Sequence, residues 1–193
     1  IDDAGGVFRN VIACATATEQ QSRIHGHDYV IGVDWGKHND FTVLSVVDIG
    51  NREQVFADRF NQIDYTVQAG RLKALADRFK PAGIVAESNS MGEPLIEQLQ
   101  RDGLPVIPFQ TTNSSKTTAI DALALAFEQQ SISVLNDPIQ VAELQAYEME
   151  RLPSGLLRYN APAGMHDDAV MALALAWHGA TAGRRRRPRV REY

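Results

Sequence analysis

The chain has 193 residues, a length that fits one domain, because hydrophobic cores usually divide only beyond about 250 residues. Hydrophobic residues make up 44% and charged residues 22%, so there is enough apolar side chain for a folded core. No run approaches the roughly 18 apolar residues of a membrane-spanning helix, and the N-terminus lacks a charged segment leading into an apolar signal core. We therefore expect an intracellular protein with no membrane partner.

The single cysteine, Cys14, excludes an intramolecular disulfide and a zinc site built from several thiolates. Its neighbours are small and apolar, which predicts a buried and inert thiol. Any bound metal ion is therefore expected to use oxygen ligands.

The net charge of −5 is unevenly distributed. The last ten residues hold six arginines and one glutamate, so the first 183 carry 13 basic and 23 acidic side chains, a formal charge of −10. An acidic surface repels DNA, so action on DNA would need a local basic track, metal ions or a partner. We expect residues 181–193 to form a disordered basic tail that binds DNA or docks onto another protein.

The first half of the chain predicts three antiparallel strands and a helix. Each strand is a short run of apolar and β-branched residues, and turn-prone segments join the strands. Asp64 can cap the helix, and Pro81 lies just beyond its end. The predicted strands are 29–34, 41–48 and 53–60, and the predicted helix is 65–79.

In the second half, strands and helices alternate. Three antiparallel strands followed by this alternation imply an α/β fold with a mixed five-stranded sheet flanked by helices, because parallel neighbours need helical crossovers. This is the ribonuclease H-like order. The predicted strands are 83–87 and 104–109, with an edge segment at 132–135 and a hairpin at 152–159; the predicted helices are 93–101, 113–130, 138–149 and one that begins near His166.

Two acidic residues end predicted strands. Asp34 follows an apolar run, where an unpaired buried carboxylate would cost several kcal/mol. A divalent cation could compensate it, because Mg²⁺ takes hard oxygen ligands. The alternative is a turn-capping aspartate that accepts hydrogen bonds from the amides of Gly36 or Lys37. Glu87 lies in the crevice where open α/β sheets bind ligands, and a loop carboxylate without a role is an equal alternative.

Asp167 and Asp168 begin a helix that is apolar on every face and must be buried. Simple capping is the alternative for one aspartate, but one cap does not need two acids. Successive helical residues point about 100° apart, so one aspartate should be a primary metal ligand and the other secondary. Three acids on separate elements could converge and hold two cations roughly 4 Å apart for phosphodiester hydrolysis. One metal would lower the pKa of the attacking water, and the other would stabilise the leaving 3′-oxygen.

Three segments, Val30–Gly36 (VIGVDWG), Ile84–Asn89 (IVAESN) and His166–Ala174 (HDDAVMALA), carry a family resemblance. From about residue 29 to 179 the chain resembles the C-terminal nuclease domain of the large subunit of DNA-packaging terminases of tailed bacteriophages. The first segment alone is not specific, because Asp-x-Gly after a strand also occurs in actin and sugar kinase folds. The resemblance implies that the catalytic residues are Asp34, Glu87 and Asp168, which would bind two Mg²⁺ or Mn²⁺ ions with Asp167 as an accessory ligand; the role of His166 stays open.

The resemblance also implies an activity and partners. The activity is endonucleolytic cleavage of concatemeric double-stranded viral DNA at the start and end of packaging, in the host cell cytoplasm. The implied partners are the ATPase domain of the same full-length chain, the portal protein and the small terminase subunit. No Gly-x-x-x-x-Gly-Lys-Ser/Thr loop occurs, so the ATPase half is not in this sequence. We expect residues 1–27 to lead in from that domain and 28–180 to form the nuclease domain.

Several polar and basic residues are further candidates for DNA contacts. Three lie at a predicted helix start, where free amides and a lysine could hold a phosphate, and the others lie beside Asp34 or in the predicted hairpin. Ordinary capping and solvent exposure are the alternatives. The candidates are Asn113, Ser114, Lys116, Lys37, Arg151 and Arg158.

Three other functions remain open at this point. A resolvase or transposase nuclease of the same fold would use similar acids on a different DNA shape. An actin-like ATP-binding domain would use the Asp34-Trp35-Gly36 turn, but it needs a second glycine-rich phosphate loop that the sequence lacks. A non-catalytic docking module would fit the acidic body and the basic tail.

Overall fold

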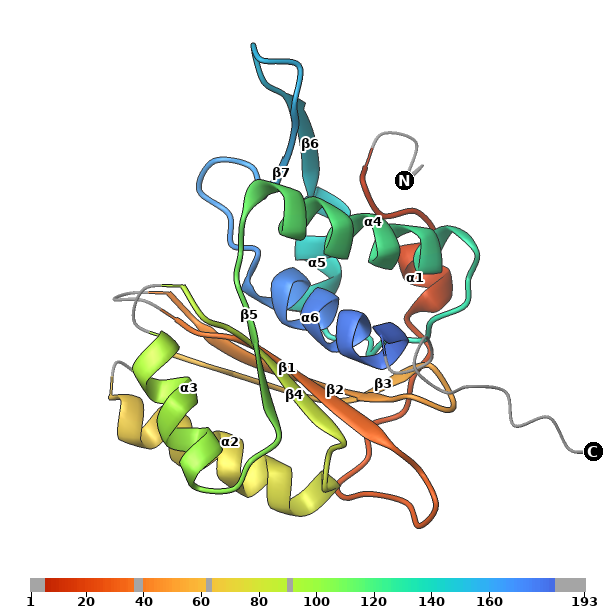
Figure 1. The fold of residues 1–193 in the computed structure, drawn as a ribbon. Helices are drawn as coiled ribbons and strands as arrows, with labels where there is room; N and C mark the ends of the chain where they lie inside the picture. The colour runs from red at the N-terminus through yellow and green to blue at the C-terminus, as the bar shows by residue number, and fades with distance from the viewer. Residues whose placement is uncertain (1–5, 37–39, 62–63, 90–91, 183–193) are drawn as a thin grey trace, which may run out of the picture.

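The computed structural model describes residues 6–36, 40–61, 64–89 and 92–182. Its centre is a five-stranded sheet in the order β3-β2-β1-β4-β5, in which β1 pairs antiparallel with β2 and parallel with β4 (Figure 1). The predicted mixed sheet flanked by helices is therefore confirmed. The strands are β1 (Tyr29–Asp34), β2 (Thr42–Asp48), β3 (Glu53–Phe60), β4 (Gly83–Glu87) and β5 (Val106–Phe109).

Helices cover both faces of this sheet (Figure 1). The helices on one face are α2 (Tyr65–Phe79) and α3 (Gly92–Arg101). On the other face α6 (Asp168–Ala182) lies against the sheet, α5 (Pro138–Ala146) contacts β3 through hydrogen bonds between Gln140 and Gln54, and α4 (Asn113–Glu128) and the short α1 (Val11–Cys14) pack outside them. Successive side chains of β1 point to opposite faces, so this strand packs against the helices of both layers. Ile31 and Val33 pack in the α2 layer, whereas Val30 packs with Leu175 of α6.

The last helix, α6, is buried as its continuous apolar sequence predicts. Every residue from 169 to 177 is buried. The helix crosses β1 at very close range, because a Cβ atom on Gly32 would overlap the carbonyl oxygen of Ala172. Only glycine can occupy this position in β1 without moving α6 away from the sheet.

The predictions for residues 138–160 need correction. Helix α5 ends at Ala146, not at Met149, because Tyr147 has an extended backbone (φ −64°, ψ 132°). The hairpin therefore starts earlier than predicted, with strands β6 (Glu148–Arg151) and β7 (Leu157–Asn160) joined by a turn in which Gly155 has a positive φ of 84°. The buried Tyr147 and the apolar Met149 extended the apparent helical pattern, although Met149 is 55% exposed.

Residues 132–135 join the sheet through a single bridge between Ser133 and Glu53 of β3, and a second bridge joins Leu135 to Ala17 in the segment before β1. The predicted edge pairing at β3 is therefore confirmed in this limited form. Other predicted ends of helices and strands differ from the structure by two residues or fewer, which is the usual spread for such boundaries.

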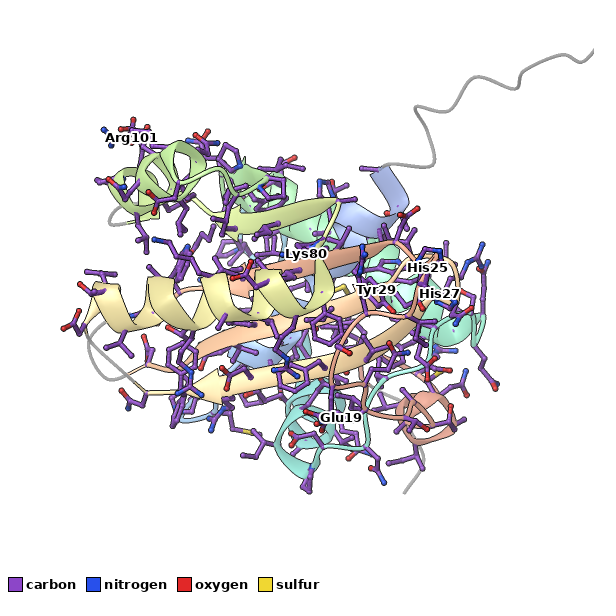
Figure 2. All side chains as sticks on the ribbon, turned by 90° about the horizontal axis from the view of Figure 1, so that it is seen from below. Glu19, His25, His27, Tyr29, Lys80 and Arg101 are labelled. Carbon is purple, nitrogen blue, oxygen red and sulfur yellow. The ribbon has the colours of Figure 1, made fainter. Side chains whose placement is uncertain are left out.

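The segment before β1 packs on the domain. Phe8, Val11 and Cys14 are buried in the same core cluster as α4 and α6, so the predicted buried thiol is confirmed. Near the start of β1, His27 stacks on Tyr29, and Figure 2 shows the two close together at the right-hand end of the sheet. The boundary between residues 27 and 28 stays a prediction. The first two residues of the proposed tail, Thr181 and Ala182, still belong to α6, and the rest of it, residues 183–193, lies outside the described residues. None of the helices in the described ranges is long and apolar enough to cross a membrane.

Candidate active site

Asp34 and Glu87 end neighbouring parallel strands at the same level. β1 and β4 pair with Val33 opposite Ala86, so the next residue of each strand stands beside the other at the C-terminal edge. Side chains two residues apart in a strand share a face. Asp34 and Glu87 therefore point to the α6 side, the side on which Gly32 and Val85 contact that helix.

Helix α6 brings Asp168 to the same edge. It runs antiparallel to β1, because Ala172 lies against Gly32 and Gly179 lies against Val30. Four helical residues rise about 6 Å and two strand residues rise about 6.6 Å. Asp168, four residues before Ala172, therefore lies over the end of β1, two residues after Gly32.

These carboxylates also act on one another electrostatically. Burial raises the pKa of Asp34 well above its ordinary value, and the negative charges of Glu87, Asp168 and Asp167 raise it further. The positive charge of Lys116 opposes them only in part. The edge thus holds an excess of negative charge, which a bound cation would relieve.

Asp168 has an oxygen atom that no hydrogen bond fills. Its Oδ2 is buried and accepts no hydrogen bond from the described residues; the Nδ1 atom of His166 is 3.5 Å away. Burial raises the pKa of Asp168 to about 6; the charge of His166 lowers it, and those of Asp167 and Asp40 raise it. A buried carboxylate oxygen without a hydrogen-bond donor costs about 1–3 kcal/mol or more. A bound cation would remove this cost, so the Oδ2 atom of Asp168 suits a metal ligand.

The cap of α6 comes from Glu143 of α5, a residue that the sequence reasoning missed. Its side chain is 5% exposed, and Oε2 accepts hydrogen bonds from the amides of Ala169 at 2.8 Å and Val170 at 3.3 Å. Burial raises the pKa of Glu143 to about 7, although these hydrogen bonds lower it. Because Glu143 takes the free amides, neither Asp167 nor Asp168 is needed as the cap, and the capping alternative for them is not what the structure shows.

Asp167 has surroundings of its own. Its Oδ2 lies 3.2 Å from the Lys116 ammonium and accepts a hydrogen bond of 3.4 Å from the Tyr147 hydroxyl. Burial, followed by the charge of Asp167, raises the pKa of Tyr147, so this phenol stays a proton donor. The two adjacent aspartates therefore differ, since Asp167 is paired with protein groups and Asp168 is not fully paired.

The turn after Asp34 also bears on the capping alternative. The amide of Gly36 donates a hydrogen bond of 2.8 Å to the Thr42 hydroxyl, which in turn donates to Gln68 at 2.8 Å. Gly36 is therefore committed to Thr42 rather than to Asp34. The other proposed partner, Lys37, lies outside the described residues.

The remaining candidates for DNA contacts lie on α4 and the hairpin. Lys116 and Arg158 line a hollow of about 560 Å³ together with Asp167. Asn113 donates a 3.0 Å hydrogen bond to the hairpin backbone, Arg151 donates to its own turn, and Ser114 is exposed. Roles for these residues in DNA binding stay predictions.

The donors at the sheet edge suit a hard divalent cation. They are carboxylate oxygens, they repel one another, and one of them is buried without a hydrogen bond. As placed, no group of three or more His, Cys, Asp or Glu side chains in the described ranges is close enough to form a complete metal cage.

Comparison with known proteins shows the family of this chain. Residues 31–179 match the family described as Terminase RNaseH-like domain. The terminase large subunit of Thermus virus P23-45 is 36% identical over 152 residues, which are 78% of this chain and 31% of that protein. The chain thus spans about a third of this relative's length.

Solved structures are similar over most of the chain. The large terminase nuclease of thermophilic phage G20c with bound magnesium has a TM-score of 0.82 and 30% identity, covering 90% of this chain and 97% of that one. The same nuclease has also been crystallised with cobalt and with zinc. The large terminase of bacteriophage HK97 shares the fold, with a TM-score of 0.72 and 11% identity, over 91% of this chain and 43% of that one. The chain therefore belongs to the terminase RNaseH-like domain family, the nuclease domain of phage terminase large subunits.

Proposed function

We propose that this domain is a divalent-metal-dependent endonuclease that cleaves concatemeric double-stranded viral DNA at the start and end of genome packaging. Its catalytic metal ligands are Asp34, Glu87 and Asp168. The observation that carries the proposal is their meeting at one edge of the sheet, where burial and three neighbouring carboxylates raise the pKa of Asp34. Family membership and the related nuclease with bound magnesium support it.

The chain's own residues have distinct tasks in this proposal. Asp34 and Glu87 are fixed by paired strands, so their relative position is rigid, and Asp168 offers an unfilled buried oxygen from α6. Asp167 is a secondary ligand, because Lys116 and Tyr147 already hold one of its oxygens. Glu143 fixes the first turn of α6 and so positions Asp168.

The cofactor proposed is a pair of Mg²⁺ or Mn²⁺ ions. When bound, they would supply a low pKa for the attacking water and charge neutralisation at the leaving 3′-oxygen. The carboxylates would hold these ions and need not transfer protons themselves. Because the described donors are oxygens, the site favours hard cations over thiolate-seeking ones.

The domain does not act alone in this proposal. We propose that the domain acts with an ATPase domain on the same full-length chain, the portal protein and the small terminase subunit, in the cytoplasm of the infected host. The large subunit of Thermus virus P23-45, of which this chain matches 31%, supports the proposal of a further domain on the same chain. The acidic body, with a formal charge of −10 over residues 1–183, also suggests that DNA is delivered by partners.

A plasmid assay tests the proposed activity. The 193-residue chain is incubated with supercoiled plasmid and Mn²⁺, Mg²⁺ or EDTA, beside an Asp34→Ala variant prepared in parallel. We expect metal-dependent nicking and linearisation, weak and tolerant of DNA sequence, that the variant loses. Cleavage that survives the substitution, or no cleavage with either metal, would contradict the proposal.

A further inference from the structure

Arg59 stands in the same cross-strand row as Asp34. Asp34 pairs with Val43 of β2, and Val43 pairs with Arg59 of β3. Residues paired in this way point to the same face, and Val43 packs against Ala169 and Ala172 of α6. Arg59 therefore faces the α6 side of the sheet, two strand spacings or about 10 Å from Asp34.

The guanidinium of Arg59 has no anionic partner in the described part of the chain. The side chain is half-buried, its Nε atom is buried without a hydrogen bond, and its carbon Cζ lies 3.4 Å above the centre of the Phe41 ring. Glu143 is near enough for the positive charge to lower its pKa, yet no hydrogen bond or ion pair joins the two side chains. A partly buried charge left this way carries a free-energy cost that an incoming anion would remove.

The neighbouring residue of β3 shows the contrast. Asp58 points to the opposite face, where it forms an ion pair of 2.7 Å and a second hydrogen bond of 2.9 Å with Arg71 of α2. Arg59 lies on the other face, that of the catalytic carboxylates, and forms no ion pair of this kind with a described residue.

The Phe41 ring links this arginine to the site. Its face supports the guanidinium, and the ring also meets His166 in an edge-to-face contact with centroids 5.7 Å apart. His166 in turn lies 3.5 Å from the unfilled Oδ2 of Asp168. Stacking on an aromatic ring restricts a guanidinium and leaves its in-plane N–H groups available for a planar or tetrahedral oxyanion.

We propose that Arg59 binds a DNA backbone phosphate next to the phosphate at which the strand is cleaved. This inference rests on the proposed nuclease function. A guanidinium matches phosphate oxygens in a bidentate manner. In an acidic domain, such a contact supplies the local positive charge that DNA binding requires beside the carboxylates. Arg59 positions the substrate and takes no part in the bond-breaking step.

The experiment compares Arg59→Gln and Arg59→Lys with wild type in Mn²⁺-dependent cleavage of a duplex, over a range of DNA and KCl concentrations. For Arg59→Gln we expect KM to rise about tenfold with kcat changed less than about twofold, and the salt slope of kcat/KM to fall by about one. Arg59→Lys should be intermediate, because it keeps the charge but not the bidentate geometry. Arg71→Gln, which removes the same charge from the opposite face, is the matched control and should keep the wild-type KM and salt slope.

The outcomes separate the alternatives. If Arg59 only balances Glu143, Arg59→Gln will lower the melting temperature and leave KM and the salt slope unchanged, which overturns the proposal. An equal rise of KM in Arg71→Gln would show an effect of net charge alone and would also overturn it. Absence of cleavage by wild type would overturn the nuclease function and this inference together, whereas an active wild type with a wild-type-like Arg59→Gln overturns this inference only.

Discussion

Two carboxylates at opposite ends of the sheet, the buried Asp48 and the half-buried Asp34, have opposite surroundings. Asp48, where β2 ends near the start of β1, is fully buried, and its oxygens accept hydrogen bonds from Gly50, Asn51 and the Nδ1 atom of His27 at 2.6 Å. Asp34, at the other end of β1, faces other carboxylates instead. An acidic side chain that stabilises the fold is surrounded by hydrogen-bond donors, whereas one that binds a ligand has few donors around it in the absence of that ligand.

The largest expected effect is the loss of DNA cleavage on substitution of Asp34, the functional carboxylate of this pair. Replacing Asp34 by Asn keeps the side-chain shape but removes a metal-binding charge, so we expect cleavage to fall by about 1,000-fold or more, as the loss of several kcal/mol of metal-assisted stabilisation implies. The melting temperature should stay level or rise, because the substitution relieves repulsion with Glu87 and Asp168. Plasmid cleavage and thermal unfolding measure the two effects, and a strongly destabilised variant would contradict this account.

Asp48→Ala tests the structural carboxylate and should lower the stability of the fold. It leaves His27 and the amides of Gly50 and Asn51 without their acceptor, so we expect a loss of about 3 kcal/mol of unfolding free energy and a melting temperature lower by roughly 10 °C. Cleavage measured well below the melting temperature should stay within a few fold of wild type. A loss of activity in a folded Asp48 variant would show that the two ends of the sheet are not independent.

A smaller effect is expected at Glu143, which belongs to the fold and to the site at once. Glu143→Ala removes the acceptor of the first amides of α6, so Asp168 is less well oriented, and the Mn²⁺ concentration for half-maximal cleavage should rise by about tenfold. Asp137→Ala is the control, since it removes the cap of α5, a 2.8 Å bond to the amide of Gln140, away from the site. If both variants need the same Mn²⁺ concentration, Glu143 contributes to stability only and does not position Asp168.

The smallest effect is the pH dependence of stability without metal. The folded-state pKa values of Asp168 and Glu143, about 6 and about 7, lie above the ordinary values of 3.8 and 4.5. The unfolded chain therefore releases these protons at lower pH than the folded one, and stability is lost as pH rises from about 4 to about 7. In EDTA the melting temperature should fall by roughly 5 °C over that range, and Mg²⁺ or Mn²⁺ should restore it near pH 7. A rise of melting temperature with pH in EDTA would contradict the raised pKa values.

Much of the fold could be predicted because its signals are local. The continuous apolar strand at 29–34, the alternating strand at 53–60 and the fully apolar run after Asp168 have patterns that follow from burial alone. Asp34 and Glu87 could be singled out because a charged residue at the end of an apolar strand needs an explanation. The end of α5 could not be predicted, because apolar residues at 147 and 149 continue a helical pattern until tertiary packing buries Tyr147 in an extended conformation.

Glu143 and Arg59 were missed for a different reason, since their significance depends on tertiary neighbours. Glu143 looks like an ordinary helical glutamate, although it shares the buried stripe of Val141, Leu144 and Tyr147, a spacing that could have raised suspicion. Arg59 could have been placed on the face of Asp34 only with the register of both antiparallel pairs known.

Direct measurement of metal binding tests the central claim, that the under-paired carboxylates are a divalent-cation site. Mn²⁺ is titrated by calorimetry into wild type, Asp34→Asn and Asp48→Asn, all at pH 7 and without DNA. We predict that wild type and Asp48→Asn bind Mn²⁺ with similar affinity, whereas Asp34→Asn binds at least about tenfold more weakly. Unchanged binding by Asp34→Asn, or loss of binding in Asp48→Asn with the fold intact, would contradict the account.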